Sequence, residues 1–234
     1  MRDRFLLILA ITFAVLYVGL WHWLTPGDSA KLSRADVDGY LARLAGHLPT
    51  TPTEEAEFLG RLREWGYADD GRPIYMLNVM SYYDQLKPVP RGEQVTGTPR
   101  EANQTYEKNI AHLLVGLGGY PVFAGTSERT TRPDRTSGSL VDAAGQLVDT
   151  DDVLVVRYPS RRAFLALISD PAYLPWSPYK MASVQLALLP LSAKLLVPDP
   201  RLVAAAAFIM VFLAVGWRRA SRRRRGFDRT TVVS

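Results

Sequence analysis

Two polar residues lie inside strand-like apolar runs and are the first candidates for chemistry. Asn78 belongs to the run IYMLNVM and Arg157 to the run VLVVRY. Alternate residues of a strand share a face, so Asn78 stands with Met76 and Met80, and Arg157 stands with valines. A buried polar group needs a partner or a ligand. If the two faces coincide, we expect Asn78 and Arg157 to point into one pocket.

Three tyrosines are placed to line the rim of this candidate pocket, namely Tyr82, Tyr83 and Tyr106. The alternative is that Asn78 and Arg157 satisfy one another or a dimer interface. No second catalytic group with a recognisable motif accompanies them, so the sequence assigns no catalytic residue.

Other chemistry-bearing patterns are incomplete. The chain has no cysteine and three histidines, none at metal-ligand spacing, so we expect no metal site and no cofactor. Haem is the alternative, but a helical wheel places His112 on the solvent side of its helix. Asp149, Asp151 and Asp152 indicate a solvated loop, because no calcium-binding spacing follows them.

The elements that must position these residues can be predicted from periodicity and caps. Four strand candidates are IYMLNVMSYY, YPVFA, VLVVRY and QLALLPL. Thr98 and Glu101 form a capping box for a helix that ends at Gly118-Gly119. Ser160 caps a second helix, whose Arg161 and Arg162 are expected to be exposed. The order is βαββαβ, so we predict an α+β fold with one antiparallel sheet and helices on one face.

Two flanking features complete this middle region. Ser33 and Thr53 are predicted to cap two helices of an N-terminal extension. A polar stretch from Thr126 to Thr150 is predicted to be a long loop, with a small hairpin around Gly145.

Three motifs within residues 72–192 resemble those of one known superfamily. They are VLVVRYPSRRAFLALISDPAY, the tyrosine helix from Tyr106 to the Gly-Gly turn, and the opening strand with its internal asparagine. Together they resemble the dimeric ferredoxin-like α/β-barrel superfamily, and most closely its small bacterial members of unknown function. The resemblance implies a homodimer whose two sheets pack face to face around a pocket. Some members of the superfamily are cofactor-free or haem-dependent monooxygenases, and others have no known activity.

The two ends of the chain are predicted to be membrane segments. Residues 5–24 are an uncharged apolar run long enough to span a bilayer, and Trp21 and Trp23 lie at its end. A cleaved signal peptide is the alternative for this run, but its length and bulky end favour an anchor. Residues 202–217 form a second, shorter run that arginines follow directly. A buried or interfacial helix is the alternative for this run, and the arginines favour a span.

The charge distribution indicates a membrane protein and excludes a nucleic-acid-binding one. Of the net charge of +5, residues 202–234 contribute +6 and residues 1–24 contribute +1, which leaves −2 for residues 25–201. A nucleic-acid-binding domain would carry its basic residues on the folded body. Arginines flanking both spans place both termini in the cytoplasm and residues 25–201 outside it, in the cell membrane.

The predicted organisation is therefore a cytoplasmic stub and first span (1–24), a helical lead-in (25–71), the ferredoxin-like domain (72–192), a linker (193–201), the second span (202–217) and an arginine-rich tail (218–234). The partners expected are the lipid bilayer, a second copy and a small hydrophobic ligand. We expect a membrane-anchored module that binds a small molecule or a partner. The alternative is a cofactor-poor enzyme of the monooxygenase type acting on a hydrophobic small molecule.

Overall fold

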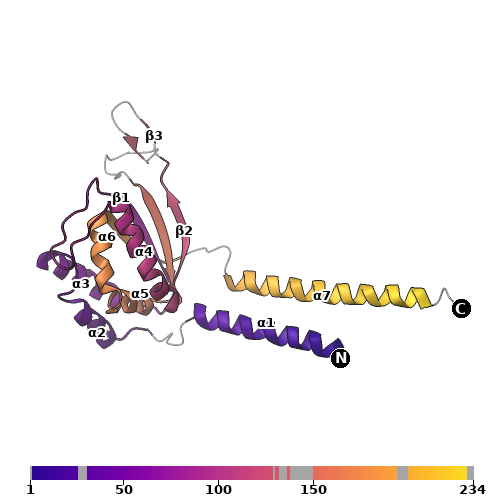
Figure 1. Ribbon diagram of the computed structural model, residues 1–234. Helices are drawn as coiled ribbons and strands as arrows, with labels where there is room; N and C mark the ends of the chain where they lie inside the picture. The colour runs from indigo at the N-terminus through magenta and orange to yellow at the C-terminus, as the bar shows by residue number, and fades with distance from the viewer. Residues whose placement is uncertain are drawn as a thin grey trace. The chain divides into compact units, whose positions relative to one another are not determined.

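The chain forms two compact units, Thr25–Ala193 and a second unit made of the two ends, Met1–Leu24 and Lys194–Ser234 (Figure 1). The structure, a computed structural model, describes residues 2–25, 31–128, 130–131, 136–137, 150–193 and 200–230. The first unit is an α+β domain, and the second consists of two apolar helices.

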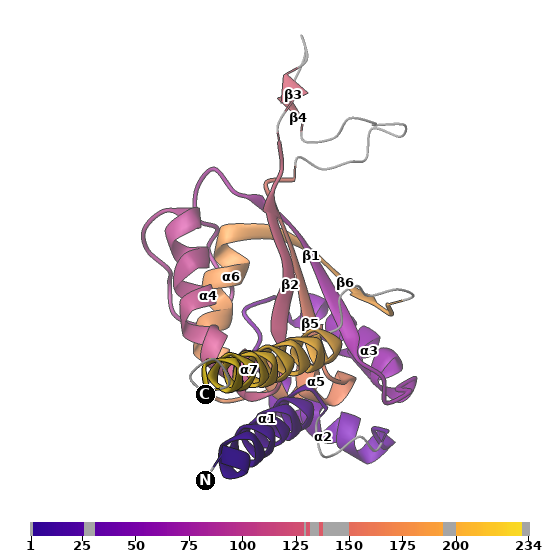
Figure 2. The same ribbon diagram turned by 90° about the vertical axis from the view of Figure 1, so that its right-hand side faces the viewer.

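The sheet of the α+β domain has four antiparallel strands in the order β2-β5-β1-β6 (Figure 2). The strands are β1 (Ile74–Tyr82), β2 (Tyr120–Thr126), β5 (Asp152–Tyr158) and β6 (Val184–Leu191). β2, β5 and β6 contain the whole of the runs predicted from the sequence, and β1 ends one residue before the predicted end at Tyr83. Pro190 lies in β6, which is an edge strand. Proline has no backbone N–H to donate to a neighbouring strand, and an edge strand tolerates this because it has a neighbour on one side only.

The strand register gives the sheet an inner and an outer face. Ile74 and Met76 of β1 pair with Tyr158 and Val156 of β5, and all four side chains are buried in the core. The intervening positions point to the opposite side, where Leu189 is 43% exposed. This outer face is defined by the described side chains at Tyr75, Leu77, Val79, Phe123, Val153, Val155, Arg157, Ala187, Leu189 and Leu191.

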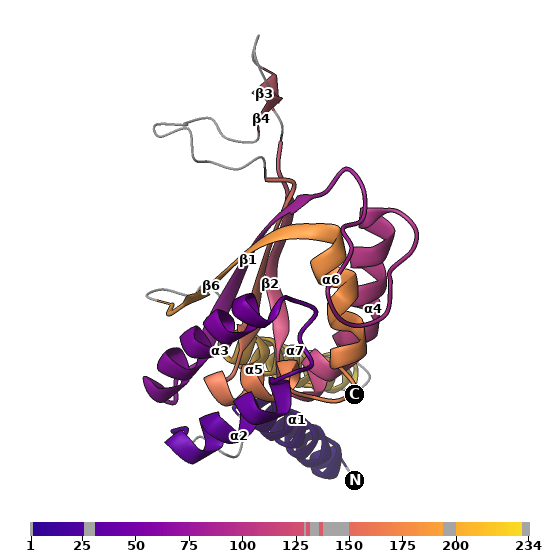
Figure 3. The same ribbon diagram turned by 90° about the vertical axis from the view of Figure 1, so that its left-hand side faces the viewer.

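Helices cover the inner face (Figures 1 and 3). They are α4 (Pro99–Gly116), α5 (Arg161–Ile168), the short 3₁₀ helix η1 (Leu174–Trp176) and α6 (Ser177–Ser183). The predicted capping box of Thr98 and the predicted cap of Ser160 are both present. Gly118 follows α4 with φ of +73°, a left-handed conformation that glycine adopts without strain.

The N-terminal extension forms α2 (Arg34–Leu44) and α3 (Pro52–Tyr67). Ser33 caps α2 as predicted, but α3 is capped by Thr51 and not by Thr53. Thr51 precedes Pro52 and lies three residues before Glu54, which completes a capping box that Thr53 cannot form.

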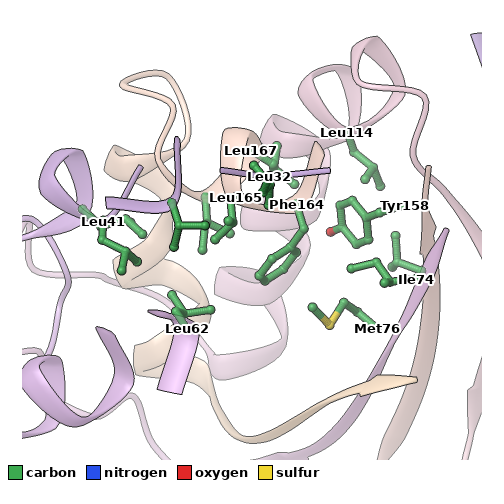
Figure 4. Close-up of a cluster of buried hydrophobic side chains, with 14 of the residues drawn as sticks. Leu32, Leu41, Leu62, Ile74, Met76, Leu114, Tyr158, Phe164, Leu165 and Leu167 are labelled. Atoms are coloured by element: carbon green, nitrogen blue, oxygen red, sulfur yellow. The ribbon is translucent and has the colours of Figure 1, made fainter. Parts of the chain in front are cut away.

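One hydrophobic core joins this extension to the sheet (Figure 4). Leu41 and Leu62 of the extension lie in the same cluster as Phe164 and Leu165 of α5 and Met76 of β1. Phe164 packs edge-on against Trp65, with ring centroids 5.6 Å apart, and against Tyr158, at 5.3 Å. The extension is therefore part of the domain's core.

Arg161 and Arg162 fasten the extension to α5, which corrects the expectation that they are exposed. The Arg161 guanidinium donates to the carbonyl of Trp65 and lies 3.7 Å from Asp69. Arg162 Nη2 lies 3.2 Å from Asp36 Oδ2. Their side chains are only 13% and 20% exposed.

Acid should weaken this fastening. Hydrogen bonds from Ser33, and then from Arg162, lower the pKa of Asp36 from 3.8 to about 2. The folded pKa lies below the unfolded one, so this stabilisation is complete above pH 3.8 and is lost as pH falls toward 2. Asp36→Asn should flatten that part of the urea-midpoint profile, and Ser33→Ala should shift it to higher pH. Unchanged profiles for both variants would contradict this account.

The long connection between β2 and β5 contains a two-residue ladder, β3 (Thr130–Thr131) with β4 (Thr136–Ser137). The hairpin predicted around Gly145 lies outside the described residues.

The second unit is a pair of antiparallel helices, α1 (Arg2–Leu24) and α7 (Pro200–Thr230). Phe13 and Phe208 stack with ring centroids 4.9 Å apart. Arg201 lies 4.6 Å from the Trp21 ring at one end, and Arg219 lies 3.7 Å from the Phe5 ring at the other. Segments Arg4–Leu24 and Pro200–Ala220 are each long and apolar enough to cross a membrane. The α7 helix begins before and ends after the predicted span of 202–217.

Candidate functional site

The structure separates Asn78 from Arg157. Asn78 pairs with Leu154 in the register of β1 and β5, whereas Arg157 pairs with Tyr75. Tyr75 and Asn78 are three positions apart on β1, and an odd separation along a strand places two side chains on opposite faces. Asn78 is therefore on the inner face, and Arg157, which pairs with Tyr75, is on the outer face. The condition for a shared pocket, that the two faces coincide, is not met.

Each of the two residues has partners on its own side of the sheet. The Asn78 amide donates to the carbonyls of Met76 at 3.2 Å and Leu154 at 3.3 Å. The Arg157 guanidinium lies 5.5 Å from the Tyr120 ring, and the residue is buried. Arg157 is thus the charged group of an outer face that is apolar and aromatic apart from Ser81 and Gln185 at one end.

The three predicted rim tyrosines also divide. Tyr83 packs beside Lys87, whose Nζ lies 5.0 Å from its ring, and its backbone N–H donates to Ser183. Tyr82 and Tyr106 instead meet at a polar cluster on the inner face. Its central residue is Lys180 of α6, which no local sequence pattern indicates.

Lys180 is buried between α6, α4 and β1. Its Nζ lies 3.1 Å from Asn103 Oδ1, 2.7 Å from Met80 Sδ and 5.4 Å from the centre of the Tyr106 ring. The Asn103 amide in turn donates to Tyr82 Oη at 3.2 Å and to Glu107 Oε1 at 2.8 Å. Within the described part of the chain, Lys180 forms no ion pair.

Burial controls the acid–base properties of this cluster. It lowers the pKa of Lys180 from 10.5 to about 8, and the charges of Glu107 and Asp152 oppose that shift. Burial, followed by the hydrogen bond with Asp152, raises the pKa of Tyr82 to about 12. The pKa of Tyr106 is well above its usual value because the ring is buried beside Tyr173, whose hydroxyl lies 3.1 Å from that of Tyr106. The cluster therefore holds an amine that gains and loses a proton in mildly alkaline solution.

The edge of the cluster is built from the start of α4 and the start of β5. Arg100 lies 4.3 Å from the Tyr82 ring and within 4.0 Å of both Asp151 and Asp152. The buried Asp151 carboxylate accepts the Tyr82 backbone N–H at 2.8 Å. Asp151 is therefore a structural acceptor, which corrects its placement in a solvated loop; Asp149 lies outside the described residues.

A helical periodicity could have indicated Asn103. It lies three and seven residues before Tyr106 and Ile110, on the side of α4 that faces the core, and it is 2% exposed. Lys180 gives a weaker signal, because its seven-residue helix is too short to show a periodicity.

The structure locates the histidine that was considered as a haem ligand. His112 is exposed on α4, as its wheel position predicted. Among the described residues, no three His, Asp or Glu side chains gather where they could hold a metal ion.

Comparison with known proteins gives resemblances at low TM-scores. No protein-family model and no curated protein matches the chain. Two crystal structures of RPA0582, a protein of unknown function from Rhodopseudomonas palustris, one of them methylated, are 25% and 24% identical. Both have a TM-score of 0.46 and cover 66% and 65% of this chain and 98% and 100% of the other.

A crystal structure of SnoaB, a cofactor-independent oxygenase from Streptomyces nogalater, is also similar. It is 14% identical with a TM-score of 0.33, and the match covers 55% of this chain and 99% of the other. At these TM-scores, none of the resemblances assigns an activity to the chain.

Proposed function

We propose that this protein is a two-span membrane protein whose ferredoxin-like domain lies outside the cytoplasm, pairs with a second copy and acts as a binding module. Its ligand is a small hydrophobic molecule or a partner protein. The strand order β2-β5-β1-β6, with α4 and α5 in the two crossovers, supports the ferredoxin-like topology.

The apolar outer face of the sheet carries this proposal. Phe123, Leu189 and Leu191 are 56%, 43% and 41% exposed, and half-buried aliphatic side chains lie on the neighbouring strands. A soluble domain rarely leaves a contiguous face of this kind uncovered. Packing two such faces together removes the apolar area from water and leaves Arg157 as the polar anchor for a ligand between them.

The helix pair supports the membrane anchoring. Arg201 and Arg219 lie 18 residues apart on α7, or about 27 Å at 1.5 Å per residue. That separation is close to the thickness of a hydrocarbon core, roughly 30 Å. The antiparallel pairing brings Phe5, near the start of α1, and Arg219 of α7 to the same end, and the arginines beyond residue 217 favour the cytoplasmic side for it.

An enzyme is the second candidate, and Lys180 is the observation that favours it. A buried amine with a pKa lowered to about 8 can accept a proton from a bound substrate. Tyr82 and Tyr106 would then line the inner site with Lys180, whereas Asn78 and Tyr83 would position β1, the strand that carries Tyr82.

The outer-face pairing predicts the mass of residues 25–193 in solution. Phe123→Glu and Leu189→Glu each place a charge in the proposed interface, so both should convert a dimer into a monomer in light scattering. Val115→Glu, at a 47% exposed position on α4, is the matched control and should remain a dimer. A wild-type monomer would overturn the pairing.

The absence of cysteine makes the topology directly testable. A single cysteine at the exposed Glu57 should react with a membrane-impermeant maleimide in intact cells. A single cysteine at Ser234 should react only after permeabilisation. The reverse pattern would overturn the proposed orientation.

A further inference from the structure

One end of the helix pair gathers cationic side chains from both helices. Arg219 of α7 lies over the Phe5 ring of α1 at 3.7 Å. The side chains of Arg4 and Arg218, next to these two residues in the chain, are exposed. Trp217 is 77% exposed, and amphipathic rings of this kind favour the headgroup layer of a bilayer. The cationic group defined by Arg4, Arg218 and Arg219 therefore lies where α1 begins and where the apolar part of α7 ends.

The guanidinium of Arg219 has a hydrogen-bond donor without an acceptor among the described residues. Its Nη1 is buried, yet it has no hydrogen-bond partner among the residues that the structure describes. The ring of Phe5 occupies one face of the guanidinium and accepts no in-plane hydrogen bond. A guanidinium donates through a planar fork that matches the oxygens of a phosphate. An oxyanion beside Arg219 would satisfy the unpaired N–H and the local positive charge together.

We propose that Arg218 and Arg219, with Arg4, bind the phosphate of an anionic phospholipid in the cytoplasmic leaflet. The site rests on the proposed membrane anchoring and extends it from a general attraction to a defined headgroup contact. The lipid is favoured over free phosphate because its acyl chains lie along the apolar side chains that precede Arg218, including Met210 and Leu213, which are 64% and 63% exposed.

Trp217 supplies a reporter next to the site. We would reconstitute the full chain, with Trp21 and Trp23 replaced by phenylalanine, into phosphatidylcholine vesicles that contain phosphatidylglycerol. Either lipid is brominated in turn, and quenching of the emission shows which one lies beside Trp217. Trp65 and Trp176 belong to the α+β domain, so their emission is the unquenched baseline.

We expect phosphatidylglycerol to be enriched beside Trp217 by about fivefold for each arginine that it contacts. Arg218→Gln with Arg219→Gln should abolish the enrichment. Arg201→Gln removes one positive charge from the other end of α7, so it is the control for position along the helix and should keep the enrichment. Replacing Arg222 to Arg225 with glutamine should also leave most of it.

The possible failures are distinguishable. Absence of quenching by either lipid would overturn the membrane anchoring itself. Equal quenching by the two lipids, or an enrichment lost only in the Arg222–Arg225 variant, would overturn the site while leaving the anchoring intact. Loss of the enrichment on adding inorganic phosphate would assign the site to free phosphate and overturn the lipid proposal.

Discussion

Phe164→Ala is expected to lower the free energy of unfolding of the α+β domain by about 3–5 kcal/mol, as truncation of a well-packed aromatic side chain does. Phe164 is 4% exposed, and its ring contacts Trp65 of α3 and Tyr158 of β5 edge-on. Alanine would leave a cavity where the extension, α5 and the sheet meet. Because the three share one core, we expect them to unfold in one transition.

Urea unfolding of residues 25–193, followed by tryptophan fluorescence and by far-ultraviolet circular dichroism, measures this effect. Met181→Ala removes a 38% exposed side chain from α6, and its cost should stay below about 1 kcal/mol. A loss that small for Phe164→Ala, or separate transitions for the two probes in the wild type, would show that the extension folds independently of the sheet.

The elements could be predicted from the sequence because their signals are local. The capping box of Thr98, the glycine after α4 and the alternation within β1 each involve residues a few positions apart. The cap of α3 was predicted at Thr53, but the structure has it at the neighbouring Thr51. Only Thr51 combines a proline at the next position with a glutamate at the third, and that combination selects it.

The candidate site could be predicted only in part, because it depends on contacts distant in sequence. Alternation shows which residues of one strand share a face, but the relation between two strands depends on their register. Asn78 and Arg157 therefore could not be assigned to a common face in advance. Arg162 likewise finds its partner Asp36 at a separation of 126 residues, so nothing near Arg162 in the chain indicates that it is buried.

Lys180 illustrates the same limit on the scale of a short helix. Its neighbours in the sequence suggest an ordinary exposed lysine, yet Asn103, Met80 and Tyr106 enclose its amine. Tyr82 and Tyr106 were predicted as rim residues of a different pocket. In the folded domain they lie around Lys180, which is far from both tyrosines in the sequence.

Lys180 should make the domain more stable as the solution becomes mildly alkaline. Burial lowers the pKa of the amine from 10.5 in the unfolded chain to about 8 in the folded one. Between these values the unfolded state binds one more proton, so the free energy of unfolding rises with pH. From pH 8 to pH 10 the increase should be about 2 kcal/mol, because the full slope of about 1.36 kcal/mol per pH unit applies only well between the two pKa values.

Buried tyrosines limit the pH range over which the free energy of unfolding rises. Burial raises the folded pKa of Tyr82 above the unfolded value of 10.0, and it does the same for Tyr106 and Tyr158. Their contribution to stability is complete below pH 10 and is lost above it, as the unfolded phenols ionise. The stability of the domain should therefore pass through a maximum near pH 10.

Lys180→Met removes the ionisable group and keeps an unbranched chain of similar length, so urea unfolding at each pH isolates its effect. The variant should lack the rise between pH 8 and pH 10 but keep the fall above pH 10, since the tyrosines are unchanged. Lys87→Met, which removes an exposed lysine of the β1–α4 connection, should keep both limbs. If the free energy of unfolding rises equally in wild type and Lys180→Met between pH 8 and pH 10, the amine is not the group that titrates. That result would contradict a role for the inner cluster in proton transfer. If the rise is present and specific to Lys180, the domain holds a buried amine whose proton is exchanged near pH 8, which is the property that an enzyme acting at the inner face would need.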